Sequence, residues 1–207
     1  VAACSRAAQW PSAIALLEEA RRSGVAPSAA VFNAAITACG RGKQWAHAIA
    51  LGAEMRCGAV SVTAATYGAL VDACARGIAW ARALALVTWD TGAAAQLPLG
   101  VAAISAAISA CEAAGRWRHA LETLRSMLCA RVQPDAIVYR ACISACEKGR
   151  QWRLALLLLC SLRSARVAMG IWAVNSAIAA CARKSRWQHS LALLAELPRA
   201  RLEPDVL

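Results

Sequence analysis

The sequence has few acidic residues and few aromatic residues other than tryptophan. It contains eight Trp but one Phe and two Tyr, and 12 Asp and Glu stand against 23 Lys and Arg. The net charge of +11 favours binding to a polyanionic partner. Net charge indicates which partners a protein attracts and does not indicate its fold. The ten cysteines include no CxxC pair, so a dithiol or zinc-ribbon motif is missing.

Long uncharged runs are also scarce. The longest covers residues 91–111, is rich in alanine and contains Gly92, Pro98 and Gly100. We therefore expect a helix–loop–helix junction there and no membrane span. The sequence has no Ser-His-Asp arrangement, no paired acids with a catalytic rationale and no glycine-rich phosphate loop. We expect no enzyme activity and no cofactor.

What the sequence does have is an internal repeat. The pattern Cys-x5-Trp occurs six times, at Cys4/Trp10, Cys39/Trp45, Cys74/Trp80, Cys111/Trp117, Cys146/Trp152 and Cys181/Trp187. Successive cysteines are 35, 35, 37, 35 and 35 residues apart. Residues that recur at a fixed period are first of all packing positions. We expect reduced, buried thiols and no metal site, and the histidines at 47, 119 and 189 fall in separate repeats.

The period defines five full units and two partial ones. The full units are 29–63, 64–100, 101–135, 136–170 and 171–205, with 1–28 the end of an earlier unit and 206–207 the start of a later one. We therefore treat 1–207 as one repeat array that begins inside a unit, and expect it to be part of a longer protein. The second full unit is two residues longer, so an irregular loop is predicted around 91–98.

Each unit reads as two helices. Apolar residues spaced by four and three, such as Phe32, Ile36 and Cys39, mark one face of the first helix. The second helix opens near the tryptophan and carries a small residue at its centre, for example Ala120, which lets helices approach closely. One hairpin cannot bury its apolar face alone, whereas stacked hairpins can, so an all-α solenoid is predicted.

Segments 31–51, 66–77, 134–159 and 174–194 resemble the pentatricopeptide repeat family, in its plant and algal organellar type. The resemblance rests on the period, the spacing of the Cys and Ala positions and the terminal Pro-Asp, as at Pro134 and Asp135. Tryptophan at the start of the second helix departs from the family, as do two units that end in Gly. The resemblance implies a right-handed α-solenoid of tandem 35-residue helix–turn–helix repeats that binds single-stranded RNA. It also implies RNA processing, editing, stability or translation in a chloroplast or mitochondrion.

In the family, the fifth and last residues of each repeat read one base. The resemblance carries this role to the pairs Asn33/Thr63, Gly68/Gly100, Ser105/Asp135, Arg140/Gly170 and Asn175/Asp205. The last pair matches the family's uracil pair, the third resembles its guanine pair, and the first leans towards a pyrimidine. The two pairs that contain glycine match none.

A second interpretation of these residues is structural. Asn, Ser and Asp side chains can hydrogen-bond a base edge. The residues before the first helices, namely Ser28, Thr63, Asp135 and Asp205, can equally cap those helices. We expect capping in most of them, and it is compatible with base reading because a carboxylate has two oxygens.

Basic residues recur two positions after the repeated cysteine. They are Arg6, Arg41, Arg76, Lys148 and Arg183, with Ala113 the exception. The family uses this position for backbone phosphates, and a line of cations beside a groove suits a strand of RNA. The alternative is solvated cations near helix C-termini, where positive charge is favoured. Glu147, beside Lys148, is interpreted as a solvated turn residue.

Two function classes therefore stay open. The first is single-stranded RNA binding, supported by the resemblance and the net charge. The second is a helical scaffold that binds a protein or peptide in the same groove, as tetratricopeptide repeats do. Neither class requires a membrane, protein partners are compatible with both, and the oligomeric state is left open.

Overall fold

The fold is described by a computed structural model. It describes residues 9–24, 27–58, 60–90, 101–165 and 170–183, together with 188, 190 and 191. Within these residues the chain forms ten α-helices and no strand. It divides into two compact units, Val1–Ala110 and Cys111–Leu207, which are considered separately below. The irregular loop predicted around 91–98 lies outside the described residues.

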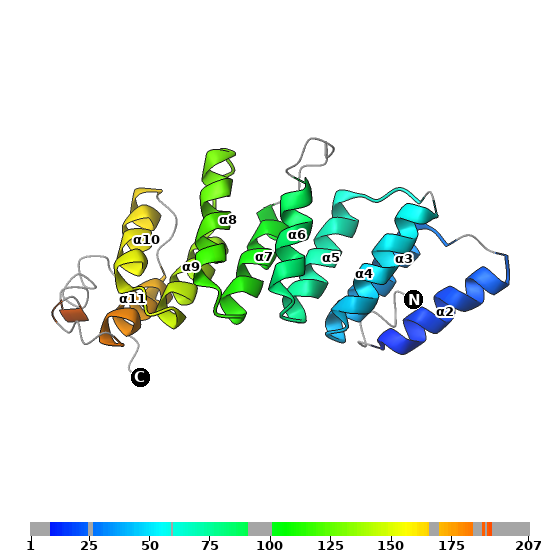
Figure 1. Cartoon of the computed structure of the whole chain (residues 1–207), viewed down its shortest axis with the longest axis horizontal. Helices are drawn as coiled ribbons and strands as arrows, with labels where there is room; N and C mark the ends of the chain where they lie inside the picture. Colours follow the sequence, from blue (N-terminus) through cyan, green and yellow to red (C-terminus); the bar gives the residue numbers. More distant parts are fainter. Residues whose placement is uncertain are drawn as a thin grey trace. The chain divides into compact units, whose positions relative to one another are not determined.

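The helices alternate between two classes along the chain (Figure 1). The first helices are α3 (Ala29–Arg41), α5 (Ala64–Arg76), α7 (Val101–Ala113), α9 (Ala136–Lys148) and α11 (Ile171–Ala182). The second helices are α2 (Trp10–Arg22), α4 (Trp45–Cys57), α6 (Trp80–Asp90), α8 (Trp117–Cys129) and α10 (Trp152–Ser164). Every described second helix begins at the repeated tryptophan, as predicted.

In each unit one first helix packs against both its own second helix and the next first helix. In the N-terminal unit α3 contacts both α4 and α5, and in the C-terminal unit α9 contacts both α10 and α11. This pairing buries the predicted apolar face, and the stripe residues Phe32, Ile36 and Cys39 form part of one core cluster. Each described cysteine of the 35-residue repeat is buried, which confirms the expected packing role.

Small residues let these helices approach closely. Ala48, Ala120 and Ala155 have no exposed surface; they lie in the first turns of second helices and not at their centres, where the sequence placed them. Two first helices approach closely at Gly40 of α3. A Cβ placed there would lie 3.0 Å from both the Cα and the Cβ of Ala73 in α5. Because the obstacle includes backbone, only glycine fits at this crossing without moving a helix.

The repeated tryptophan also contacts the next repeat. In the N-terminal unit the Trp10 ring occupies the space where a Cβ at Gly42 would lie, and a Cβ at Gly77 would be 2.6 Å from Cδ1 of Trp45. In the C-terminal unit Trp117 covers Gly149 in the same way. Each of these glycines ends a first helix. Trp10, Trp45 and Trp117 are therefore packing positions, as predicted, and the partner of each is a glycine in the following turn.

The residue after each of these glycines has a left-handed backbone conformation. Lys43, Ile78 and Arg150 have φ of 57°, 58° and 55°, and at the equivalent position of the remaining described turn Gly115 has φ 67°. The chain closes the helix end with a backbone hydrogen bond to the repeated cysteine, such as Ala79 N–H to Cys74 O at 2.9 Å. The glycine therefore serves the tryptophan contact, and the strained conformation falls on its neighbour.

We expect Ile78→Gly to stabilise the N-terminal unit by about 1 kcal/mol. A left-handed conformation costs an L-residue roughly 1–2 kcal/mol, and glycine removes this cost. Part of the stabilisation is lost again, because glycine raises the conformational entropy of the unfolded chain. Little burial is lost because Ile78 is 56% exposed. Urea denaturation of the variant and the wild type measures the change.

The matched control is Gly115→Ile, which introduces the same residue at the equivalent position of the next repeat. It should destabilise the chain, since Gly115 has φ 67°. A lower unfolding free energy for Ile78→Gly would contradict the explanation.

Candidate functional site

In the N-terminal unit, two predicted base-reading residues differ in how far the fold already uses them. Thr63 caps α5 in a reciprocal arrangement. Its hydroxyl oxygen accepts from Thr66 N–H at 3.4 Å, and its own N–H donates to Thr66 Oγ1 at 3.3 Å. Asn33 is half-buried, and its amide oxygen is buried with no hydrogen-bond partner in the described structure. A buried acceptor left without a donor costs about 1–3 kcal/mol, so Asn33 is the residue here that a ligand donor would satisfy.

Gly68 and Ser105 offer less to a ligand. A Cβ at Gly68 would meet nothing within 4 Å, so the surface of α5 is open there. The Ser105 side chain is 5% exposed, and its hydroxyl donates to Val101 O at 2.7 Å within α7. Gly100 lies outside the described residues. Ser105 and its predicted partner Asp135 belong to different compact units.

Asp135 caps α9, because its Oδ1 accepts from Val138 N–H at 2.9 Å. Capping is thus observed at Thr63 and Asp135, as expected, whereas Ser28 precedes α3 without a side-chain cap bond. The cap at Asp135 uses one carboxylate oxygen, and the other carries no hydrogen bond within the described residues. Asp205 lies outside the described residues.

In the C-terminal unit, Arg140 lines a surface pocket of about 240 Å³ together with Ala136, Ile137 and Trp172. Gly170, the predicted partner of Arg140, lies directly beneath the Trp172 ring, which occupies the space of a Cβ at that position. Trp172 therefore lies against Gly170 and also lines the pocket that Arg140 lines.

Sequence reasoning missed Trp172. Trp172 is one of the two tryptophans outside the Cys-x5-Trp pattern, and this exception could have marked it in the sequence as a candidate functional residue. Asn175, on the same helix α11, is half-buried.

The predicted phosphate-contacting cations of the N-terminal unit are exposed. Arg41 and Arg76 both lie in the last turns of their first helices. Arg76 Nε donates to Asp72 Oδ2 at 2.8 Å, one turn back on α5. Arg6 lies outside the described residues.

In the C-terminal unit, each of these cations pairs with an acid of the preceding repeat. Lys148 Nζ is 2.6 Å from Glu112 Oε1, and Arg183 Nη2 is 3.2 Å from Glu147 Oε1. Both pairs join residues 36 positions apart. The interpretation of Glu147 as a solvated turn residue was wrong: its side chain is 20% exposed and tied to Arg183. These pairs hold adjacent first helices together at their C-terminal ends.

The described cysteines divide into buried and exposed groups. The buried thiols are those of Cys39, Cys74, Cys111, Cys142, Cys146 and Cys181, and the exposed ones are those of Cys57, Cys129 and Cys160. Burial raises the pKa of Cys74 and Cys111 to about 11 and that of Cys146 to about 12. The pKa of Cys142 is raised as well, chiefly by burial and further by the neighbouring thiols of Cys146 and Cys111. Thiols with such pKa values are poor nucleophiles and poor metal ligands at neutral pH.

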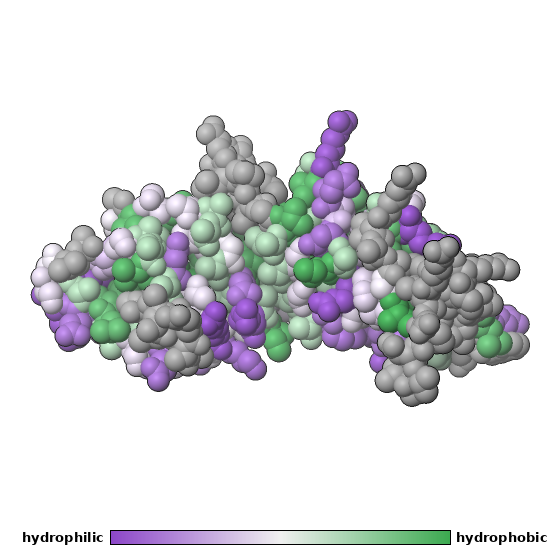
Figure 2. Space-filling view, turned by 180° about the vertical axis from the view of Figure 1, so that it is seen from behind, coloured by the Kyte–Doolittle hydropathy of each residue, from purple (hydrophilic) through white to green (hydrophobic). Residues whose placement is uncertain are grey.

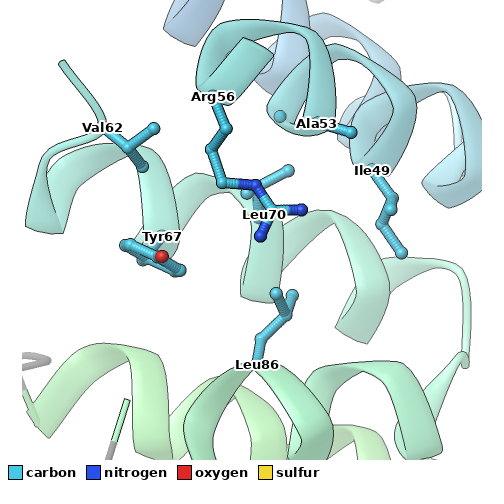
Figure 3. Close-up of a pocket in the computed structure, with 8 residues that line it drawn as sticks. Ile49, Ala53, Arg56, Val62, Tyr67, Leu70 and Leu86 are labelled. Carbon is cyan, nitrogen blue, oxygen red and sulfur yellow. The ribbon is translucent and has the colours of Figure 1, made fainter. Parts of the chain in front are cut away.

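A small apolar pocket lies between α4, α5 and α6 (Figure 3). The Arg56 side chain reaches over Leu70, with Tyr67 and Leu86 on the surrounding walls. The pocket encloses about 30 Å³, which is room for about one water and far less than a small-molecule site needs. Gly52 lines it and packs closely on Leu70, since a Cβ at Gly52 would lie 2.9 Å from Cδ1 of Leu70.

Two further observations concern the described part of the chain. No group of three His, Cys, Asp or Glu side chains there could hold a metal ion. None of the helices described combines the length and the apolar character needed to span a bilayer. On the face shown in Figure 2, hydrophilic and hydrophobic residues are mixed.

Comparison with known proteins matches this geometry to one repeat class. The family model of the PPR repeat matches residues 105–132. Curated proteins give no match. The chain is similar to the crystal structure of the pentatricopeptide repeat protein PPR10 from maize, with a TM-score of 0.74 and 26% identity. That match covers 98% of this chain and 29% of the maize protein, so the chain spans less than a third of it.

Two RNA complexes share the fold. PPR10 in complex with an 18-nt psaJ RNA element matches with a TM-score of 0.60 and 24% identity, over 99% of this chain and 33% of that one. The PPR domain of Arabidopsis thaliana protein-only RNase P 1 in complex with tRNA matches with a TM-score of 0.68 and 12% identity, over 82% of this chain and 89% of that one. The predicted all-α solenoid class is confirmed. The chain thus shares its 35-residue helical hairpins and its fold with these pentatricopeptide repeat structures.

Proposed function

We propose that the chain binds single-stranded RNA, with one base read per repeat. The observation that carries the proposal is the match of almost the whole chain to PPR10 in complex with an RNA element. The net charge of +11 supports it, because neutralising phosphates and releasing their counterions supplies much of the affinity for nucleic acids.

The base-reading residues proposed are the fifth and last of each unit. They are Asn33, Thr63, Gly68, Gly100, Ser105, Asp135, Arg140, Gly170, Asn175 and Asp205. The unpartnered amide oxygen of Asn33 supports a base contact there, since a base amino group would supply the missing donor. At Arg140 and Gly170 the exposed guanidinium beside Trp172 favours stacking over reading by hydrogen bonds.

The phosphate contacts proposed are the basic residues near the ends of the first helices, namely Arg6, Arg41, Arg76, Lys148 and Arg183. Lys148 and Arg183 are each tied to a carboxylate. Both are also about half exposed, so a phosphate can approach on the outer side. A role in organellar RNA processing, editing, stability or translation, in a chloroplast or mitochondrion, completes the proposal.

The base-reading proposal is tested at Asn175. We expect Asn175→Ser to change the preferred base at the last full repeat, by about tenfold in relative affinity, because a bidentate amide becomes a single hydroxyl. Fluorescence anisotropy with short RNAs that vary one base at a time measures the preference.

Gly68→Ser serves as the control, since it changes a different repeat and should leave the preference at the last repeat unaltered. Binding should weaken steeply with salt. Absence of RNA binding by the wild type at moderate salt would sink the proposal, and binding of peptides without a salt slope would favour a protein-binding scaffold.

A further inference from the structure

The turns of consecutive repeats meet at one edge of the C-terminal unit. The Trp117 ring, at the start of α8, covers Gly149 in the turn that precedes α10. This contact brings residues next to Trp117 beside residues next to Gly149. It therefore places Arg118 and Arg150 on the same edge, although they are one repeat apart in sequence.

Three exposed arginines stand on this edge around two tryptophan rings. The guanidinium carbon of Arg118 is 5.2 Å from the centroid of the Trp117 ring, and that of Arg153 is 5.3 Å from the Trp152 ring. A guanidinium stacked on a ring by its face keeps its N–H edge available for a bidentate contact. We call Arg118, Arg150 and Arg153, with the two rings, the turn surface.

The positive charge of the turn surface is not neutralised by nearby acids. Within the described residues, Arg118, Arg150 and Arg153 form no ion pair, and Glu122 makes none although it lies one turn from Arg118. Glu112 and Glu147 are engaged by Lys148 and Arg183. The predicted phosphate line of this unit is therefore partly balanced by carboxylates, whereas the turn beside it is not.

The turn surface has room for a ligand group and no apolar centre. A pocket of about 310 Å³ opens beside it, lined by Gly115, Arg116, Trp117, Arg118 and His119. Of the exposed large aliphatic residues described in this unit, Leu157 lies one turn from Arg153 on α10, whereas Leu128, Ile137 and Leu191 are further from these arginines in sequence. Protein interfaces usually bury an apolar centre of that kind. Cations on aromatic faces without such a centre suit a sugar-phosphate backbone better than a protein.

We infer that the turn surface is a second RNA contact, which binds the phosphate backbone of the segment that flanks the bases read in the groove. This inference rests on the proposed function. Arg150 follows Lys148 by two residues, so the surface is continuous with the phosphate contacts proposed there. The contact is independent of sequence, because it engages phosphates and the faces of bases.

The test compares a short U- and G-containing RNA, as long as the repeat array, with the same RNA extended by unstructured adenosines at both ends. The wild-type chain should bind the extended RNA about tenfold more tightly. The triple variant Arg118→Gln, Arg150→Gln, Arg153→Gln should lose that gain and bind the short RNA within about twofold of the wild type. Its log–log salt slope with the extended RNA should fall by about 2–3.

The matched control is Arg125→Gln, Arg131→Gln, Arg163→Gln, which removes the same charge from other exposed arginines of this unit. This control variant should still bind the extended RNA more tightly than the short RNA, by the same factor as the wild type. Arg150→Gln alone leaves both stacked pairs intact and should lose part of the gain. If the triple variant keeps the full gain, the inference is overturned. If the wild type binds neither RNA, the proposed function fails instead.

Discussion

Raising the pH from 8 to 10 should destabilise the protein by roughly 5 kcal/mol through four buried thiols alone. Burial raises the pKa of Cys74 and Cys111 from 9.0 to about 11 and that of Cys146 to about 12, and it raises the pKa of Cys142 as well. A raised pKa in the folded state means that the folded chain holds its protons longer than the unfolded chain. The stability contribution is therefore complete below pH 9 and is lost as the pH rises towards about 11 to 12.

The size of this loss comes from the number of thiols. Each pH unit above 9 costs about 1.4 kcal/mol for each thiol that ionises only on unfolding. A domain of ordinary stability has about 5–15 kcal/mol in total, so alkaline unfolding should begin near pH 10. Urea denaturation followed by circular dichroism at several pH values gives the unfolding free energy directly.

Two double variants separate this cause from general alkaline damage. Cys142→Ala with Cys146→Ala should flatten the pH dependence by about half, even if it lowers stability at neutral pH by opening small cavities. Cys129→Ala with Cys160→Ala removes exposed thiols and should leave the dependence unchanged. An unfolding free energy that stays level from pH 8 to 10 would show that the thiols ionise without unfolding.

Gly40→Val should lower the unfolding free energy by about 3 kcal/mol. Even the first carbon of the new side chain would lie 3.0 Å from the Cα and Cβ of Ala73, and valine adds two methyl groups at that crossing. Overpacking of a closed helix crossing costs about 1–3 kcal/mol, occasionally more, and valine gains little helix propensity over glycine. Thermal and urea denaturation measure the loss.

The control is Gly68→Val, on the facing helix α5. Gly68 is also inside a helix, but nothing lies within 4 Å of a Cβ there. The same substitution should therefore be neutral or slightly stabilising. Equal losses at the two positions would mean that the cost comes from β-branching in a helix and not from the contact with Ala73.

The local parts of this fold follow from the sequence, because they depend on spacing alone. The period of the Cys-x5-Trp pattern places a buried face on each first helix, and Cys39, Cys74 and Cys146 are buried as predicted. The tryptophan begins the second helix in each described repeat. Even the pair of Arg76 with Asp72 could have been predicted, since the two residues are one helical turn apart.

The contacts between repeats could not be predicted in the same way. Glu147 reads as a turn residue in its own repeat, and its partner Arg183 lies 36 residues further on. The Ser105 hydroxyl bonds to Val101 O in its own helix, and this depends on a rotamer that a sequence does not specify. The choice of glycine at position 149 becomes clear only when the Trp117 ring is seen above it.

The contact between tryptophan and glycine limits how these repeats can be exchanged. A repeat that begins its second helix with Trp10, Trp45 or Trp117 carries a ring that packs over a glycine of the repeat that follows it. Some repeats have a larger residue in place of this glycine, as at Lys184. A tryptophan transplanted in front of such a repeat could not pack in the same way. Grafted arrays that aim at a new base order should therefore move these repeats as adjoining pairs, with the seam placed inside a hairpin.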